Sequence, residues 1–185
     1  VLWRKEFGTQ FKETSPLYGS AMSPVVDQGR LIVYVGGSGQ GALTAFDPAT
    51  GRVLWAWKGD GPGYSSPVVA DLLGVRQVVT FGETHLLAVS AERGELLWKL
   101  PFTTSWVQNA ITPIVKGDLV IYSGLDHPLR AVRVARKGTV YAAEPLWENA
   151  EVANYMSTPV VVGDRVCGLS QKKKGQLFCL DTATG

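Results

Sequence analysis

Short apolar runs separated by turn residues cover the whole chain, and helical periodicity is weak throughout. Residues 43–57 show the pattern best: an apolar run, the turn Asp-Pro-Ala-Thr-Gly, and a second run that ends in two tryptophans. Asp47 can accept hydrogen bonds from its own turn, Pro48 sets φ at the first corner, and Gly51 takes a positive φ without steric cost. These signals predict a β-hairpin. Because an isolated hairpin is marginal in water, its tryptophans need another sheet to pack against.

The hairpin pattern recurs with a period near 45 residues. Its turn glycines, which follow one another at steps of 43, 44 and 47, are Gly51, Gly94, Gly138 and Gly185. A second marker, Ser or Thr followed by Pro and two β-branched residues, begins at Ser23, Ser66, Thr112 and Thr158. Two independent markers with one period, and four short strands in each period, are typical of β-propeller blades. The third copy is degenerate, because Arg133 replaces the turn aspartate.

The frame A-x-D-x-x-T-G-x-x-x-W resembles the tryptophan-docking repeat of the PQQ-type β-propellers. The first copy matches it at all five places, and the second matches at three and departs at Ser90 and Arg93. This superfamily holds quinoprotein alcohol dehydrogenases and the non-enzymatic outer-membrane assembly lipoproteins of the BamB type, so the resemblance implies the fold more strongly than an activity. The docking positions are Trp3, Ala45, Asp47, Thr50, Gly51, Trp55, Ala88, Gly94, Trp98, Gly138, Trp147, Asp181, Thr184 and Gly185.

We therefore expect an all-β fold, with residues 1–185 forming about four antiparallel blades of a larger propeller. The repeat units are approximately 3–54, 55–97, 98–146 and 147–185. Residues 2–7 are expected to be a strand that completes a preceding blade. Both ends cut through a repeat, so we expect a piece of a longer protein whose closed ring needs about seven or eight blades. Its open sheet edges should then favour self-association.

Strand positions follow from the repeat, and they sort the loops onto two faces. The loops that connect the fourth strand of one unit to the first strand of the next are long. They lie on the same face as the loops that connect the second strand of a unit to its third strand. Function usually lies in such loops on a rigid scaffold. The expected strands are 23–27, 31–35, 43–47 and 52–58, then 66–70, 77–81, 86–90 and 95–100, then 112–115, 119–122, 129–134 and 140–147, and finally 158–162, 165–169 and 177–181.

The long-loop face carries the candidate binding residues. Its amide and aromatic side chains suit a sugar, a quinone or a peptide, but a plain solvated loop is the default interpretation. His85 and His127 are only weak evidence for a metal site, because no Cys or carboxylate groups converge with them. Asp126 is more simply explained as a turn residue before Pro128. The docking tryptophans are expected to pack between blades. The candidate surface comprises Tyr64, His85, Trp106, Gln108, Asn109, Asp126, His127, Asn154 and Tyr155.

Composition narrows the function classes. The formal net charge of +2 makes no electrostatic case for nucleic acid, and no apolar run of about 18 residues predicts a membrane-spanning helix. Cys167 and Cys179 lie on neighbouring predicted strands, which leaves a cross-strand disulfide open. Cys179 occupies the small-residue position of Ala45 and Ala88, however, so a buried free thiol is the default interpretation.

The sequence favours a non-catalytic binding or scaffold propeller whose partner is a protein or a small polar ligand. No adjacent Cys-Cys pair, clustered Ca²⁺ ligands, phosphate loop or nucleophile motif is present, so no catalytic or metal-binding residue is assigned. The alternative is a fragment of a PQQ-dependent alcohol or sugar dehydrogenase, with PQQ and Ca²⁺ bound outside this stretch. The resemblance implies a periplasmic, cell-envelope or secreted location, and it is compatible with a lipid anchor in a longer protein.

Overall fold

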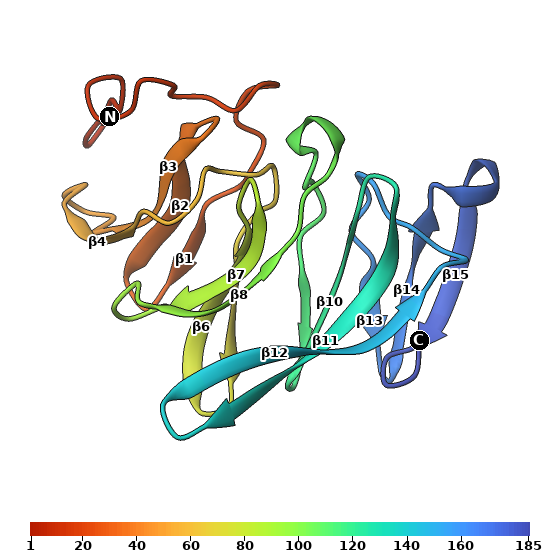
Figure 1. The fold of residues 1–185 in the computed structure, drawn as a ribbon. Helices are drawn as coiled ribbons and strands as arrows, with labels where there is room; N and C mark the ends of the chain where they lie inside the picture. Colours follow the sequence, from red (N-terminus) through yellow and green to blue (C-terminus); the bar gives the residue numbers. More distant parts are fainter.

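The computed structural model describes residues 1–185 and contains four antiparallel sheets that follow one another along the chain (Figure 1). The all-β propeller fold is confirmed. Two short 3₁₀ helices, η1 (Ser105–Val107) and η2 (Lys172–Lys174), lie in loops. The strands are β1 (Val25–Asp27), β2 (Arg30–Gly37), β3 (Gln40–Phe46) and β4 (Val53–Trp57) in sheet 1; β5 (Val68–Leu72), β6 (Val75–Phe81), β7 (His85–Ser90) and β8 (Leu96–Pro101) in sheet 2; β9 (Ile114–Lys116), β10 (Leu119–Gly124), β11 (His127–Lys137) and β12 (Val140–Asn149) in sheet 3; β13 (Val160–Val162), β14 (Arg165–Ser170) and β15 (Gln176–Asp181) in sheet 4.

Strand order within each sheet is the order along the chain. The first strands β1, β5, β9 and β13 contact one another from sheet to sheet, so they lie along the centre of the array. The fourth strands β4, β8 and β12 form the outer edges. This arrangement brings every loop that leads into a first strand towards the centre.

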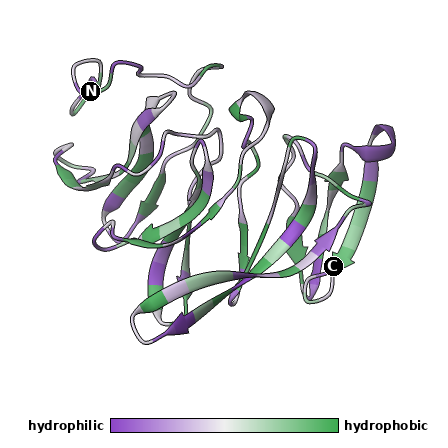
Figure 2. Cartoon of the chain, in the orientation of Figure 1, coloured by the Kyte–Doolittle hydropathy of each residue, from purple (hydrophilic) through white to green (hydrophobic).

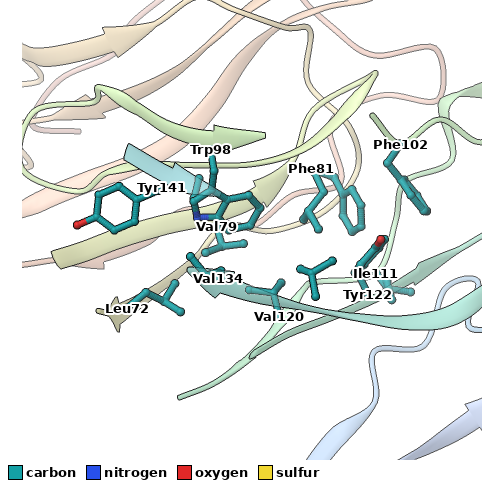
Figure 3. Packing of buried hydrophobic residues seen from close by; sticks show 13 residues of the cluster. Leu72, Val79, Phe81, Trp98, Phe102, Ile111, Val120, Tyr122, Val134 and Tyr141 are labelled. Atoms are coloured by element: carbon teal, nitrogen blue, oxygen red, sulfur yellow. The ribbon is translucent and has the colours of Figure 1, made fainter. Parts of the chain in front are cut away.

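Apolar clusters fill the spaces between successive sheets. Sheets 1 and 2 share a cluster that includes Leu43, Ala45 and Trp55 from one side and Val78 and Val89 from the other. Sheets 2 and 3 share the largest cluster (Figure 3), and sheets 3 and 4 share a smaller one. The chain therefore has no single central core, and each sheet depends on its neighbours to bury its faces.

An indole stacked on a turn glycine links neighbouring repeats at three places. A Cβ added at Gly94 would lie 2.5 Å from the Trp55 ring, one at Gly51 would lie 2.8 Å from Trp3, and one at Gly185 would lie 2.6 Å from Trp147. Each glycine also has a φ of 71°, in the region where L-residues with a Cβ are strained. Each indole Nε1 donates to the carbonyl three residues before the glycine, as Trp55 does to Ala91 O at 3.1 Å; the other two pairs are Trp3 with Pro48 O and Trp147 with Thr182 O.

The aspartates of these turns act as predicted. Asp47 Oδ1 accepts hydrogen bonds from the backbone N–H groups of Ala49 and Thr50, and Asp181 repeats the arrangement with Ala183 and Thr184. The Thr50 and Ala49 N–H groups hold the pKa of the Asp47 carboxyl below its usual value, because they stabilise the charged form.

The third unit departs from this pattern. Its β11–β12 hairpin continues past the point where the other units turn and ends in the two-residue turn at Gly138, whose missing Cβ faces open space. Trp98 therefore does not stack on Gly138; its Nε1 donates to Gln77 Oε1 at 2.9 Å instead. Tyr141 and Val134 from the extension are buried in the same cluster as Trp98 (Figure 3). Gly138 consequently allows the tight turn of the hairpin but makes no contact with a docking tryptophan.

The expected strand over residues 2–7 is wrong, since residues 1–24 contain no strand. None of the strands of residues 1–185 pairs with this segment. It packs through side chains on the outer face of sheet 1, where the rings of Trp3 and Phe7 lie 6.4 and 6.0 Å from the ring of Phe46.

The expectation that Cys179 is a buried free thiol is also wrong. Cys167 and Cys179 are directly opposite each other on β14 and β15 and are joined by a disulfide, with their Cα atoms 4.0 Å apart. Cys179 is exposed, whereas Ala45 and Ala88 in the corresponding position are fully buried. Within residues 1–185, no further sheet lies against this face of sheet 4.

Replacing Gly94 by Ala should destabilise the protein more than the same change at Gly138. Both glycines have a positive φ, so both variants carry the left-handed backbone cost of about 1–2 kcal/mol. Only the Gly94 variant must also displace an indole, which adds roughly 1–3 kcal/mol. Urea denaturation measures the difference; equal losses would show that the stacked indole tolerates a methyl group.

Trp55→Ala should lower the free energy of unfolding by about 3–5 kcal/mol, the range for truncating a large aromatic side chain in a core. Its indole is buried and hydrogen-bonded between sheets 1 and 2. Trp106→Ala is the control, because that indole is 68% exposed in a loop and should contribute far less. A similar, small loss for both variants in urea melts would refute the packing role.

Candidate functional site

A groove of about 590 Å³ opens at the centre of the long-loop face. Each of the four loops that lead into β1, β5, β9 and β13 contributes two residues to it, although these loops are separated by some 45 residues along the chain. The lining residues are Tyr18, Ala21, Tyr64, Ser66, Gln108, Ala110, Tyr155 and Met156. We call this feature the axial groove.

Hydrogen bonds between neighbouring loops hold the aromatic walls of the axial groove. The Tyr64 hydroxyl accepts the backbone N–H of Tyr18 at 2.8 Å, and the two rings lie 6.0 Å apart. The Tyr64 N–H in turn donates to the carbonyl of Asn109 at 3.0 Å. On the other side, the Tyr155 hydroxyl donates to Gln108 Oε1. The rings are thus fixed by partners in adjacent repeats.

The axial groove is neutral and offers hydrogen-bond donors. No Lys, Arg, Asp or Glu lines it. Ser66 Oγ accepts the Ser23 N–H at 2.9 Å, and Tyr64 Oη and Gln108 Oε1 are likewise occupied as acceptors. The hydroxyl hydrogens of Ser66 and Tyr64 and the Gln108 amide remain as donors. The groove can therefore bind an apolar or aromatic group that carries carbonyl or other acceptor oxygens.

Asn109 and Asn154 lie behind the groove and support its loops. Both are fully buried. The Asn109 amide donates to Gly82 O and Glu83 O at 2.9 and 3.1 Å, and the Asn154 amide donates to Ser157 O and Leu169 O. Asn109 therefore ties the loop before β9 to the segment after β6, and Asn154 ties the loop before β13 to β14. These two predicted contact residues are buried and bonded to the scaffold.

Trp106 belongs to the same loop as the groove residues Gln108 and Ala110 but does not itself line the axial groove. It lies in η1, two residues before Gln108, and its side chain is 68% exposed. Trp106 and Val107 both have positive φ values, 61° and 59°, which is an outlier for a β-branched residue. A constrained loop thus holds an indole in solvent next to the groove, where Met156 and Tyr18 are also exposed.

The two histidines lie outside the groove, each held by a different partner. His127 Nε2 is 2.7 Å from Thr103 O, and its ring packs on Phe102. His85 Nδ1 is 3.1 Å from the buried Asp60 carboxylate. Asp126, next to His127, takes a positive φ in the exposed β10–β11 turn and does not approach the groove.

Asp60 forms the centre of a second, polar hollow between the loops of sheets 1 and 2, with a volume of about 570 Å³. Besides His85, its carboxylate accepts the N–H groups of Gly61 and Thr84 and the Thr84 hydroxyl. Nearby Tyr34 has its pKa raised well above the usual value, mainly by burial and further by the charges of Asp60 and Glu83. Because the carboxylate is saturated with hydrogen bonds, this hollow is best explained as a structural junction.

The sequence pointed to Tyr64 and Tyr155 through their places before the strand prolines and to Gln108 through its place beside Trp106, but not to the other five lining residues. Tyr18 lies six places before Pro24, farther from its proline than Tyr64 or Tyr155. Ala21 and Ala110 carry no chemical signal, and Ser66 and Met156 line the groove only because the loops converge. No group of three His, Cys, Asp or Glu side chains could hold a metal ion.

The PQQ cofactor suggested by the repeat does not fit this groove. PQQ is a flat quinone with several carboxylates, so its site needs cationic partners, and none lines the axial groove. The disulfide joins residues 12 positions apart on an outer sheet face and not adjacent cysteines at the centre. No helix of the structure is both long and apolar enough to span a membrane.

Comparison with solved structures shows the same fold in proteins of different activity. BamB from Moraxella catarrhalis matches with a TM-score of 0.62 at 18% identity, over 89% of this chain and 50% of its own. A quinohemoprotein alcohol dehydrogenase from Pseudomonas putida HK5 matches with a TM-score of 0.57 at 16% identity, over 90% of this chain and 33% of its own. The computationally designed Ika4 protein matches at 15% identity with a TM-score of 0.57, over 91% of this chain and 97% of its own.

The chain thus spans half of the BamB chain and a third of the dehydrogenase. At these identities the likeness shows the fold alone. No curated protein sequence matches the chain significantly. A family model described as outer membrane protein assembly factor BamB matches residues 1–185, and the chain therefore belongs to this family of PQQ-like repeat β-propellers.

Proposed function

We propose that this protein is a non-catalytic binding propeller that holds an extended segment of a partner protein in the axial groove. The observation that carries the proposal is the convergence of four loops on one neutral, aromatic groove. Pockets that combine apolar walls with a few placed polar groups are the usual form of a binding site.

A peptide fits the groove better than the other ligands that its residue types suit. The free hydrogen-bond donors of the groove can bond to the backbone carbonyls of a peptide. The tyrosine rings and Met156 of the groove can pack against its apolar or aromatic side chains. Exposed Trp106 extends this surface beyond the groove, and tryptophan and tyrosine are enriched where proteins bind one another. The description of the family as an assembly factor for outer membrane proteins supports a protein partner.

The cell envelope is the proposed location. The family description refers to the outer membrane, and disulfides such as Cys167–Cys179 persist mainly in oxidising compartments. A PQQ-dependent dehydrogenase is the weaker alternative, because the groove lacks cationic partners for the quinone. That function would need cofactor ligands from outside residues 1–185.

Binding can be tested with an uncharged ten-residue peptide of alternating aromatic and polar residues, followed by calorimetry and by tryptophan fluorescence. A matched peptide with Ala at the aromatic places should bind much more weakly. Tyr155→Ala should reduce affinity for the aromatic peptide about 5–30-fold, as expected for loss of a central interface aromatic worth roughly 1–2 kcal/mol. Val140→Ala, on the distant β11–β12 hairpin, should leave it unchanged. Equal affinity for both peptides would overturn the proposal.

The roles of two neighbouring residues can be separated by stability and affinity. Asn109→Ala should lower the free energy of unfolding by about 1–3 kcal/mol, because it leaves the buried carbonyls of Gly82 and Glu83 without their donor. Gln108→Ala should change stability little and weaken peptide binding, since Gln108 lines the groove. Urea melts and peptide titrations of both variants test this, and a reversed pattern would place the contact at Asn109.

A further inference from the structure

The end of the β11–β12 hairpin is a two-stranded ribbon with a free edge. It begins beyond Arg133, the last residue of β11 that pairs with β10, and it projects towards the lower left in Figure 1. β12 is the outermost strand of sheet 3, so no strand pairs with its outer edge. Natural proteins usually block such an edge with features such as proline or a bulge. β12 has Pro145 and a register shift beside it, but residues 140–144 have neither.

The backbone groups along this edge alternate in direction. The pair of residues that closes a two-residue turn is hydrogen-bonded, and bonded and unbonded pairs then alternate along the hairpin. By this alternation Tyr141 and Ala143 belong to unbonded pairs. The Val134 N–H, opposite Ala143, accordingly points away from β12 and donates to Asp118 O at 2.8 Å. Tyr141 and Ala143 therefore direct their N–H and C=O groups away from β11, where no other part of the chain bonds to them.

The ribbon also carries two opposite charges that have no partner. The Lys137 and Glu144 side chains are both exposed, and neither forms an ion pair within the chain. Arg133 lies directly opposite Glu144 on β11, but it pairs with Asp118 at 3.2 Å instead. Val140, opposite Lys137, is 67% exposed. Side chains two residues apart on a strand share a face, so Val140 and Glu144 project on the same side of the ribbon.

We infer that two copies of this chain pair through the outer edges of their β12 strands, antiparallel and about a two-fold axis at Ala142. Tyr141 of one copy then lies opposite Ala143 of the other, on both sides of the axis. Each of these two pairs exchanges its outward N–H and C=O groups, which gives four backbone hydrogen bonds. The two Ala142 residues form an unbonded pair about 4.5 Å apart at Cα, a distance that their small side chains permit. Pro145 has no N–H to donate, and the paired region ends there.

The same register brings the unpaired charges together. Val140 of one copy lies opposite Glu144 of the other, and Lys137 is the next residue of that row, on β11. The long side chains of Lys137 and Glu144 can meet over the shorter Val140 side chain, once on each side of the axis. A two-fold contact requires one patch to be complementary to itself. The backbone groups, the small residue at the axis and the opposite charges meet that requirement, which favours a second copy over an unrelated strand.

This contact is separate from the axial groove. Loops at the centre of the array line the groove, whereas β12 is an outer-edge strand. The dimer therefore leaves both grooves open and, on the proposed function, can hold two segments of one partner at once. Two linked sites give a higher overall affinity than one, provided that the partner can span them.

An introduced cysteine tests the position of the two-fold axis. The protein has no free cysteine, so Ala142→Cys adds the only thiol. This variant should form a disulfide-linked dimer under mild oxidation, because the two Cα atoms lie near the lower end of the range of about 4.4–6.8 Å that a disulfide spans. Thr139→Cys is the matched control, since residue 139 is also exposed on the hairpin. Its two copies would be about 20 Å apart in this dimer, so it should cross-link at least tenfold more slowly.

Exchange of charges tests the register, with sedimentation velocity over a range of concentrations as the measurement. Wild type should approach twice the 20.0 kDa mass of one chain as its concentration rises. Lys137→Glu and Glu144→Lys should each weaken dimerisation about tenfold, because each replaces two attractive pairs by two repulsive ones. An equal mixture of these variants restores both pairs and should associate as wild type does. Circular dichroism verifies that every variant folds.

Three results would each overturn the inference. The first is a wild type that stays monomeric up to about millimolar concentration, where a weak two-fold contact is still detected. The second is equal cross-linking of the Ala142→Cys and Thr139→Cys proteins. The third is a mixture of the two charge variants that associates no better than either variant alone.

Discussion

The contact between an indole and the turn glycine of the next repeat is the constraint on which the rest of this structure depends. It works because the glycine meets two demands at once: a φ of 71° and no Cβ beneath the ring. The indole N–H finds a carbonyl three residues before the glycine, so the buried polar group is satisfied. Each contact adds to the apolar packing between neighbouring units and to polar contacts such as the ion pair of Arg76 with Asp27. The position of one sheet relative to the next follows from it, and so does the position of the loops at the centre.

The third unit shows that the same junction can be built differently. An extended β11–β12 hairpin covers the edge of sheet 2 with Tyr141 and Val134, and Trp98 finds its hydrogen bond inside its own sheet. The end of β11 is strongly hydrophilic (Figure 2), which keeps the projecting part of the hairpin in water. Burial of the interface is therefore the requirement, and the indole–glycine contact is the commoner of two ways to meet it.

The axial groove is a product of this radial arrangement. Its residues are far apart along the chain, and only the convergence of the first strands brings their loops together. Buried asparagines and hydrogen bonds between loops then fix the aromatic walls. The polar hollow around Asp60 differs, because its carboxylate is fully used in holding two loops together. The contrast separates a surface that can accept a ligand from one that maintains the scaffold.

The sequence by itself determined the repeat, the all-β fold and the docking positions of Trp3, Trp55 and Trp147, because turn chemistry and strand periodicity are local. It also located three of the eight groove residues, since Tyr64 and Tyr155 lie at similar distances from a recurring proline and Gln108 lies in the same loop as Trp106. Only the tertiary structure decided that Asn109 and Asn154 are buried supports, that Trp98 does not reach Gly138, and that Cys179 is exposed in a disulfide. In each case the physical reason is the same: burial and partner choice depend on which sheet lies opposite, and no local pattern of residues contains that information.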